Sequence, residues 1–120
     1  MRDESRRQKR IASLLREALS RVLIEELHGV SPALVTVTRV DVPADLQSAR
    51  VLLSVFGVED AAPVFAHLER RTGFIRRRLA AAVKLRYNPM LFFAPDQTAD
   101  MDERIDRLLR TNKTDEHDAS

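Results

Sequence analysis

The feature that most constrains the fold is a stripe of apolar residues near the start of the chain. From Ile11 to Leu23 these residues are separated alternately by three positions and by one. That spacing places their side chains on one face of an α-helix. We therefore expect a helix over residues 5–27 with one buried face. Gly29 follows, and we expect it to cap the helix, because glycine readily adopts the left-handed backbone that ends many helices.

The apolar spacing then changes to the alternation that is typical of strands. Val35 and Val37 alternate with threonines, and the alternation resumes at Val40 one residue out of phase, as a β-bulge would cause. A connection that contains the turn former Asp45 leads to a second alternating run over residues 49–56. We predict that the two strands pair as a hairpin.

The second half of the chain predicts two helices with a break between them. Pro63 suits the first turn of a helix, and Asp60 is positioned to cap it. We expect this helix to reach about Arg71. Gly73 then falls inside what would otherwise be one long helix, where glycine costs about 1 kcal/mol relative to alanine. The prediction is a kink or a break at Gly73.

A new apolar stripe beyond the break predicts a helix that ends at Asn88-Pro89. Ile75 and Leu79 belong to its buried face. Residues 90–94 then predict a short buried strand, and the apolar residues within 105–109 predict a weak final helix.

In this order the elements predict an α+β fold, with a three-stranded sheet and helices packed on one face. This is the order of a type II KH domain, the KH form that begins with a helix. At 120 residues the chain can bury one core, so we predict a single KH-like RNA-binding domain over residues 1–110 and a disordered tail over residues 111–120. The GxxG loop with which KH domains usually clamp nucleotides is absent, since the only glycines are Gly29, Gly57 and Gly73.

Charged residues are sorted by sign along the chain. The whole chain carries 20 Lys and Arg against 18 Asp and Glu, whereas residues 70–89 contain seven basic residues and no acidic one. Residues 1–21 are also net positive, and the remaining segments are net negative. This sorting concentrates a positive field on part of the surface and indicates a polyanionic partner.

Patterns that would mark catalysis or metal binding are missing from the sequence. The chain has no cysteine, and its three histidines lack metal-ligand spacing. The aspartates of residues 96–102 lack the glycine and the closing glutamate of a calcium loop. No phosphate-binding glycine loop, nucleophile motif, membrane-length apolar run or signal-peptide core occurs. We expect a cytoplasmic, non-catalytic protein that uses no metal, cofactor or small-molecule substrate and does not enter membranes.

Several segments are specific in their joint order and spacing. They are the basic first helix that ends at Leu27, residues 35–42 (VTVTRVDV), 45–51 (DLQSARV), 73–79 (GFIRRRL), 85–93 (LRYNPMLFF) and 96–98 (DQT). In this combination the chain resembles the bacterial ribosome-binding factor A family of small KH-like factors. In that family an interhelical Ala-x-Gly kink replaces the KH loop. The resemblance places the kink at Arg71, Thr72 and Gly73, with arginine where the family has alanine.

The resemblance implies a non-catalytic ribosome assembly factor. Its partners would be immature small (30S) ribosomal subunits and the region near the end of their 16S rRNA. Its role would be to assist late maturation, including rRNA end processing. A monomer is the simpler expectation.

We predict that the RNA-binding surface is made of the cations of the acid-free run, supported by those of the first helix. These residues are Arg76, Arg77, Lys84, Arg86, Arg70, Arg71 and Arg78, with Arg6, Lys9 and Arg10. Arg78 lies closer to the apolar border and should contribute mainly its aliphatic stem. The cations of the first helix could equally serve solubility alone. Tyr87 and the five phenylalanines mostly follow core periodicity, so we expect recognition of phosphates and shape rather than of bases.

An alternative function is a protein-interaction module. Its basic helix would dock an acidic protein, and its exposed strand edge would pair with another chain. An RNA-binding factor predicts competition by RNA and steep salt dependence. An interaction module predicts a protein complex that is insensitive to nuclease.

Overall fold

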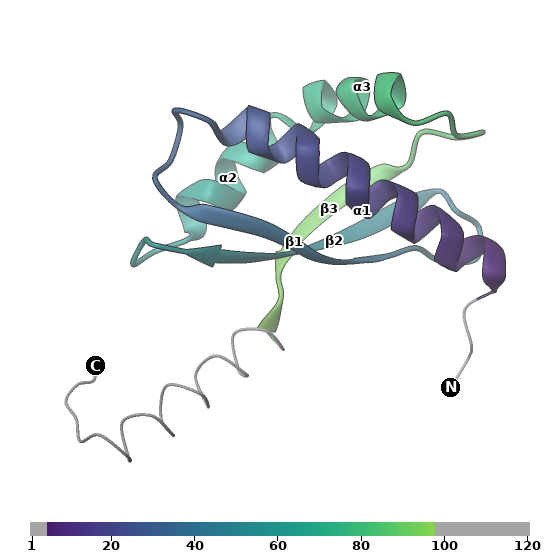
Figure 1. The fold of residues 1–120 in the computed structure, drawn as a ribbon, viewed down its shortest axis with the longest axis horizontal. Helices are drawn as coiled ribbons and strands as arrows, with labels where there is room; N and C mark the ends of the chain where they lie inside the picture. Colours follow the sequence, from purple (N-terminus) through teal and green to yellow (C-terminus); the bar gives the residue numbers. More distant parts are fainter. Residues whose placement is uncertain (1–4, 98–120) are drawn as a thin grey trace, which may run out of the picture.

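The structure is a computed structural model that describes residues 5–97 (Figure 1). Along these residues the elements are α1 (Arg6–Leu27), β1 (Leu34–Asp41), β2 (Ser48–Phe56), α2 (Ala62–Arg70), α3 (Thr72–Ala82) and β3 (Met90–Pro95). This is the predicted order of elements. The predicted final helix within 105–109 and the predicted tail at 111–120 lie outside the described residues.

The strands form one mixed sheet in the order β1-β2-β3, with β1 antiparallel to β2 and β2 parallel to β3. The register between β1 and β2 shifts between Val37 and Arg39, which confirms the predicted bulge. Because of this shift, Val37, Val40 and Val42 are all buried in the same core.

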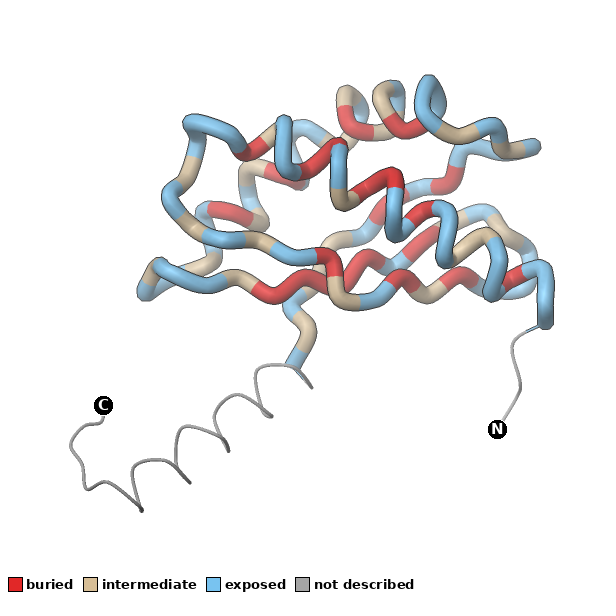
Figure 2. The backbone as a smooth tube through the Cα atoms, in the orientation of Figure 1, coloured by how far each residue is buried: buried red, intermediate tan, exposed pale blue. Residues whose placement is uncertain are grey.

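All three helices cover the same face of the sheet. α1 packs against β1 and α3, and α2 lies against β3 (Figure 1). Figure 2 shows buried positions on the sides of the helices and strands that face each other. The largest fully buried side chains are Leu15, Leu19, Val51, Leu53, Leu68, Ile75 and Leu79. The predicted α+β, KH-like architecture is therefore confirmed.

Both ends of α1 are fixed by particular residues. At its start, Gln8 N donates to Ser5 Oγ at 3.1 Å and Ser5 N donates to Gln8 Oε1 at 2.9 Å, which forms a capping box. The amide of the buried Gln8 side chain also donates to the carbonyl oxygen of Val42 at 2.9 Å. At its end, Gly29 has a φ of +78°, as expected of a residue that follows a helix cap. The hydrogen bond from Gln8 to Val42 holds the first turn of α1 against the connection between β1 and β2.

Two aspartates act as the turn or cap residues that the sequence predicts. Asp60 Oδ1 accepts a hydrogen bond from Ala62 N at 3.0 Å, although Ala61 rather than Asp60 occupies the N-cap position of α2. Asp45 Oδ1 accepts one from Gln47 N at 3.1 Å. Both carboxylates satisfy backbone N–H groups at a bend of the chain.

The helix α3 is shorter than the sequence analysis predicts. It ends at Ala82 rather than at Asn88-Pro89, and Val83 has an extended backbone with φ −134° and ψ 130°. From Val83 onward the chain alternates, with Val83 and Leu85 packed against the core while Lys84 and Arg86 are exposed. An extended segment can bury every second residue, whereas a helix could not bury this pair together. Lys84 and Arg86 therefore lie in the loop between α3 and β3 and not on the helix.

The prediction that β3 is a buried strand was wrong. Leu91 is buried, but Met90 and Phe92 are 48% and 56% exposed. β3 lies at the edge of the described sheet, and the helices cover only one face, so alternate side chains point away from the core. All five phenylalanines of the chain lie within residues 5–97, and none of them is among the fully buried side chains.

Candidate nucleic-acid interface

The break between α2 and α3 is centred on Arg71. Its backbone has φ −100° and ψ 11°, which ends α2 and lets α3 begin at Thr72. The hydroxyl of Thr72 lies 3.0 Å from the carbonyl oxygen of Leu68 and 2.9 Å from that of Glu69, so it can satisfy the end of α2. Gly73 belongs to α3 and has no positive φ. The predicted break exists, but its bend lies two residues before the glycine.

The side chain of Arg71 ties this break to the end of α1. Arg71 Nε donates to Glu26 Oε2 at 2.8 Å, and His67 Nε2 lies 2.8 Å from the same oxygen. The Glu26 side chain is only 6% exposed. The hydrogen bond from Arg71 is the largest cause that lowers the pKa of Glu26, and burial opposes it. This chain has Arg71 where the resemblance predicts alanine, and the side chain of Arg71 links the break to α1.

Two further cations of the predicted surface contact other parts of the protein. Arg78 forms an ion pair with Glu25 of α1. The guanidinium of Arg76 donates to the carbonyl oxygen of Pro89 at 2.9 Å and to that of Asn88 at 2.7 Å. Arg76 therefore positions the loop between α3 and β3.

The other predicted cations are exposed, and none of them forms an ion pair within residues 5–97. They are Arg70 at the end of α2, Arg77 on α3, Lys84 and Arg86 in the loop, and Arg6, Lys9 and Arg10 on the first turns of α1. No carboxylate of the described chain neutralises these charges, so they are available to a polyanion.

An aromatic ring lies among the arginines of the break and of α3. The guanidinium carbons of Arg71, Arg77 and Arg78 lie 4.2, 5.8 and 5.8 Å from the centroid of the half-buried Phe74 ring. At such distances the ring face attracts the cations and holds them together. This cluster was not predicted from the sequence, because the phenylalanines mostly follow core periodicity. Phe74 precedes Ile75 and so falls outside the buried stripe.

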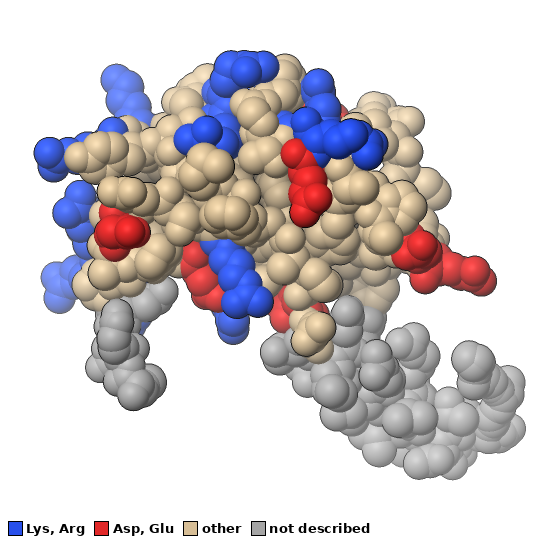
Figure 3. Space-filling model, turned by 180° about the vertical axis from the view of Figure 1, so that it is seen from behind, with Lys and Arg blue, Asp and Glu red and all other residues tan. Residues whose placement is uncertain are grey.

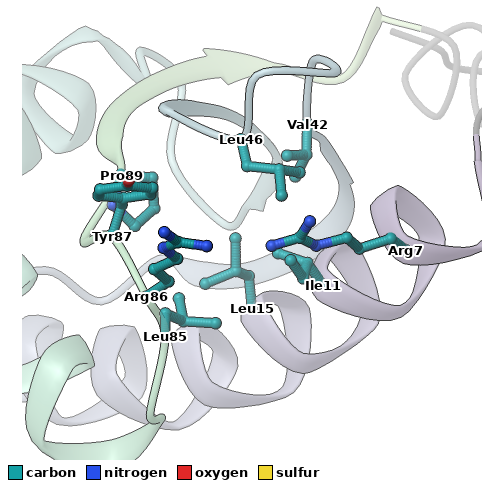
Figure 4. A pocket seen from close by; sticks show the side chains of 9 residues that line it. All are labelled: Arg7, Ile11, Leu15, Val42, Leu46, Leu85, Arg86, Tyr87 and Pro89. Atoms are coloured by element: carbon teal, nitrogen blue, oxygen red, sulfur yellow. The ribbon is translucent and has the colours of Figure 1, made fainter.

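A second basic group forms where the start of α1 meets the loop after α3. A cavity of about 40 Å³ lies there. Figure 4 shows the side chains of Arg7 and Arg86 pointing toward each other across it. Its lining residues are Arg7, Ile11 and Leu15 from α1, Val42 and Leu46 from the β1–β2 connection, and Leu85, Arg86, Tyr87 and Pro89 from the loop. Arg7 was not among the predicted site residues. Its position four residues before Ile11, on the apolar stripe, is the signal that could have identified it.

The predicted basic surface is therefore spread along the length of α3. Arg70 lies at the break and Arg77 midway along the helix, whereas Lys84 and Arg86 lie beyond its other end, roughly 16 Å from the break along the helix axis. Viewed from behind, Lys and Arg side chains gather along the left edge and the top of the molecule, over the end where α1 begins and over α3 (Figure 3). Acidic side chains protrude at the right-hand end of the same view.

Neither a metal centre nor a membrane-spanning helix is seen among residues 5–97. No group of three or more His, Asp or Glu side chains there could hold a metal ion. None of the helices in this part of the chain is both long and apolar enough to cross a bilayer.

The fold and the basic surface define a small α+β domain of the KH-like class, with a helix break in place of the glycine loop. The sequence model of the family described as ribosome-binding factor A matches residues 7–109. The chain belongs to the ribosome-binding factor A family.

Similar proteins agree with this assignment. The chain is 37% identical over 113 residues to ribosome-binding factor A of Microcystis aeruginosa, which covers 92% of this chain and 88% of that protein. It is 40% identical to the Methylorubrum extorquens protein of the same name, over 91% of this chain and 77% of that one.

Solved structures of the family share the fold. The crystal structure of ribosome-binding factor A from Thermus thermophilus matches with a TM-score of 0.63 and 27% identity, over 73% of this chain and 94% of that one. A homology model of the Thermus thermophilus factor, fitted into a cryo-EM map of a complex with 30S, matches with a TM-score of 0.59 and 27% identity, over 72% of this chain and 92% of that one.

Proposed function

We propose that this protein is a cytoplasmic, non-catalytic assembly factor that binds immature small ribosomal subunits through 16S rRNA. It assists late maturation of the subunit, including processing of the rRNA end. The observation that carries the proposal is membership of a family in which the Thermus thermophilus factor forms a complex with 30S. We also propose that the protein acts as a monomer.

The exposed cations supply the chemistry for this role. We assign the phosphate contacts first to Arg70, Arg77, Lys84 and Arg86, with Arg6, Lys9 and Arg10 in support, because these side chains form no ion pair in the described chain. Arg71, Arg76 and Arg78 hold the surface in shape through their contacts with α1 and the loop. Arg76 also keeps its positive charge on this surface, because its partners are neutral carbonyl oxygens, whereas Arg71 and Arg78 are paired with carboxylates.

The proposal is tested by sedimentation of the purified protein with immature and mature 30S particles at several salt concentrations. If four to six phosphates are neutralised, the log–log slope of affinity against salt should be roughly −3 to −5. The variant Arg70→Glu/Arg77→Glu/Lys84→Glu should lose at least about tenfold in affinity and flatten the slope by about 2.

A charge-matched control separates a local surface from net charge. Arg16→Glu/Arg21→Glu/Arg50→Glu changes the charge equally at exposed positions elsewhere, and it should bind nearly as the wild type does. Equal losses in the two variants would contradict the assigned surface. A wild type that stays at the top of the gradient at low salt, yet forms a nuclease-insensitive complex with an acidic protein, would instead support the interaction module.

A further inference from the structure

The cavity at the start of α1 combines charge and apolar surface in an unusual way. Its floor is apolar, with Leu15 fully buried, while Arg7 and Arg86 reach across it from two different elements (Figure 4). Neither arginine forms an ion pair with any residue of the described chain. Two guanidinium groups that converge without a carboxylate repel each other, and an anion between them would relieve that repulsion.

The anion that fits this arrangement best is a phosphate. Guanidinium groups bind phosphate oxygens through paired hydrogen bonds, so two of them can hold one phosphodiester from both sides. A free inorganic anion would use only these charged groups. It would leave the apolar surface between them without a partner.

Tyr87 and Leu46 give the cavity a surface that suits a flat, apolar group. Tyr87 is 54% exposed at the rim, and the guanidinium carbon of Arg86 lies 5.5 Å from the centroid of its ring. Exposed aromatic rings and arginine planes are the surfaces on which unpaired RNA bases stack. At about 40 Å³ the cavity is too small to enclose a whole base, so a base would rest over it with one edge inserted.

Leu46 itself has a strained backbone. Its φ of +59° is the only positive value among the non-glycine residues of the described chain. A leucine in this conformation costs free energy that a glycine would not, and such strain is typical of ligand-binding positions. The turn that imposes it is closed by a hydrogen bond from Leu46 N to the carbonyl oxygen of Pro43 at 3.0 Å. The side chain lines the cavity, which gives the leucine a role that glycine could not fill.

We propose that this cavity binds one unpaired nucleotide of an RNA strand. Its phosphate lies between Arg7 and Arg86, and its base packs against Leu46 and Tyr87. The inference rests on the proposed RNA-binding function and adds to it a contact with a base, which phosphate recognition alone does not include.

The test uses the full chain and its single tyrosine. Because Tyr87 is the only tyrosine, labelling with 3-fluorotyrosine gives one 19F resonance that reports on this cavity alone. The probes are a uridine decamer and an abasic ribose-phosphate decamer of the same length and charge. We expect the uridine decamer to shift the resonance and to bind about fivefold or more tightly than the abasic decamer. Equal affinities with no shift would overturn the inference.

Two variants test the base contact and the phosphate contact separately. Leu46→Gly relieves the backbone strain, so it should fold, but it removes the apolar wall. Leu46→Gly should bind the uridine decamer only as tightly as it binds the abasic decamer. The control Val30→Gly, at an exposed loop position, should keep the preference for the uridine decamer. Arg7→Gln/Arg86→Gln should weaken binding of both decamers and reduce the salt slope by about 1.4. A Leu46→Gly protein that keeps the full base preference would place the base elsewhere and refute the site.

The outcomes separate this inference from the proposed function. Salt-dependent sedimentation with small subunits, combined with equal binding of the two decamers, would refute the nucleotide site and leave the assembly role intact. Failure of the wild type to sediment with subunits would count against the assembly role. A 19F shift caused by an acidic peptide, but by neither decamer, would refute an RNA ligand and identify a protein-binding cavity.

Discussion

Arg76 and Asn88 bind each other's backbone. The guanidinium of Arg76 donates to the carbonyl oxygen of Asn88 at 2.7 Å, while the amide of Asn88 donates to the carbonyl oxygen of Arg76 at 3.2 Å. This reciprocal pair fastens the loop before β3 to α3. It therefore sets the position of Lys84, Arg86 and Tyr87, which lie in that loop.

We predict that Arg76 and Asn88 are energetically coupled. Arg76→Ala should lower the free energy of unfolding by about 1.5 to 3 kcal/mol, because it removes hydrogen bonds from a charged donor. The effect of Asn88→Ala should be smaller in the Arg76→Ala background than in the wild type, which a double-mutant cycle in urea would measure. Arg77→Ala, at the exposed neighbouring position, should change stability by less than about 0.5 kcal/mol. Strictly additive effects of Arg76→Ala and Asn88→Ala would contradict the coupling.

The Glu26 carboxylate should make stability depend on pH. Its pKa is lowered from 4.5, chiefly by the hydrogen bond from Arg71, so folding favours the ionised form. The resulting stability is fully present above pH 4.5 and is lost as the pH falls through the lower pKa of the folded state. Glu26→Gln should therefore be less stable than the wild type at pH 7, by about 1 to 3 kcal/mol, and the difference should shrink in acid. Urea unfolding at a series of pH values would measure it.

Arg71→Ala tests whether the hydrogen bond from Arg71 to Glu26 causes this pH effect. It introduces the alanine of the family kink and removes the largest cause of the lowered Glu26 pKa. Its unfolding free energy should fall less steeply on acidification than that of the wild type. A pH profile parallel to that of the wild type would show that the tether does not perturb Glu26.

Gly73 and Gly29 should respond in opposite directions to alanine. A Cβ at either position would meet nothing within 4 Å, but Gly29 has a φ of +78° whereas Gly73 is helical. Gly73→Ala should stabilise the protein by about 0.5 to 1 kcal/mol, since alanine favours the helix. Gly29→Ala should destabilise it by about 1 kcal/mol, because alanine is strained at positive φ. Thermal unfolding compares the two, and a destabilised Gly73→Ala protein would mean that the break needs the glycine.

The outer face of the sheet offers a test of the alternative function. Phe92 is 56% exposed there, on β3, an edge strand of the sheet within residues 5–97. Phe92→Ser should leave stability within about 0.5 kcal/mol. In the assembly-factor proposal it should also leave sedimentation with 30S particles unchanged. Loss of a partner protein from a pull-down with this variant, with 30S binding retained, would show that the outer face is a second interface.

The elements of this fold could be predicted because each has a clear local signal. The spacing from Ile11 to Leu23 specifies α1, and the change of phase between Val37 and Val40 specifies the bulge. The end of α3 could not be predicted in the same way. Val83 and Leu85 fit an extended segment only once the core that receives them is known.

The candidate site was harder to predict than the fold. A run of cations shows where charge is concentrated along the sequence. It does not show which guanidinium groups already bind other residues of the protein. Arg71 meets Glu26 from a distant part of the sequence, and Arg7 meets Arg86 only after α1 and the loop have packed together. Such contacts depend on tertiary structure, and no local spacing encodes them.

The parallel pairing of β2 with β3 affects how the chain completes its fold during synthesis. β2 can join β1 as soon as the hairpin leaves the ribosomal exit tunnel, but its other edge has no partner until residues 90–95 have also emerged. α2 and α3 must be made first, so every nascent chain passes through a stage with an open strand edge in the middle of its future sheet. That stage is the one at which two unfinished copies on neighbouring ribosomes would be most exposed to pairing with each other.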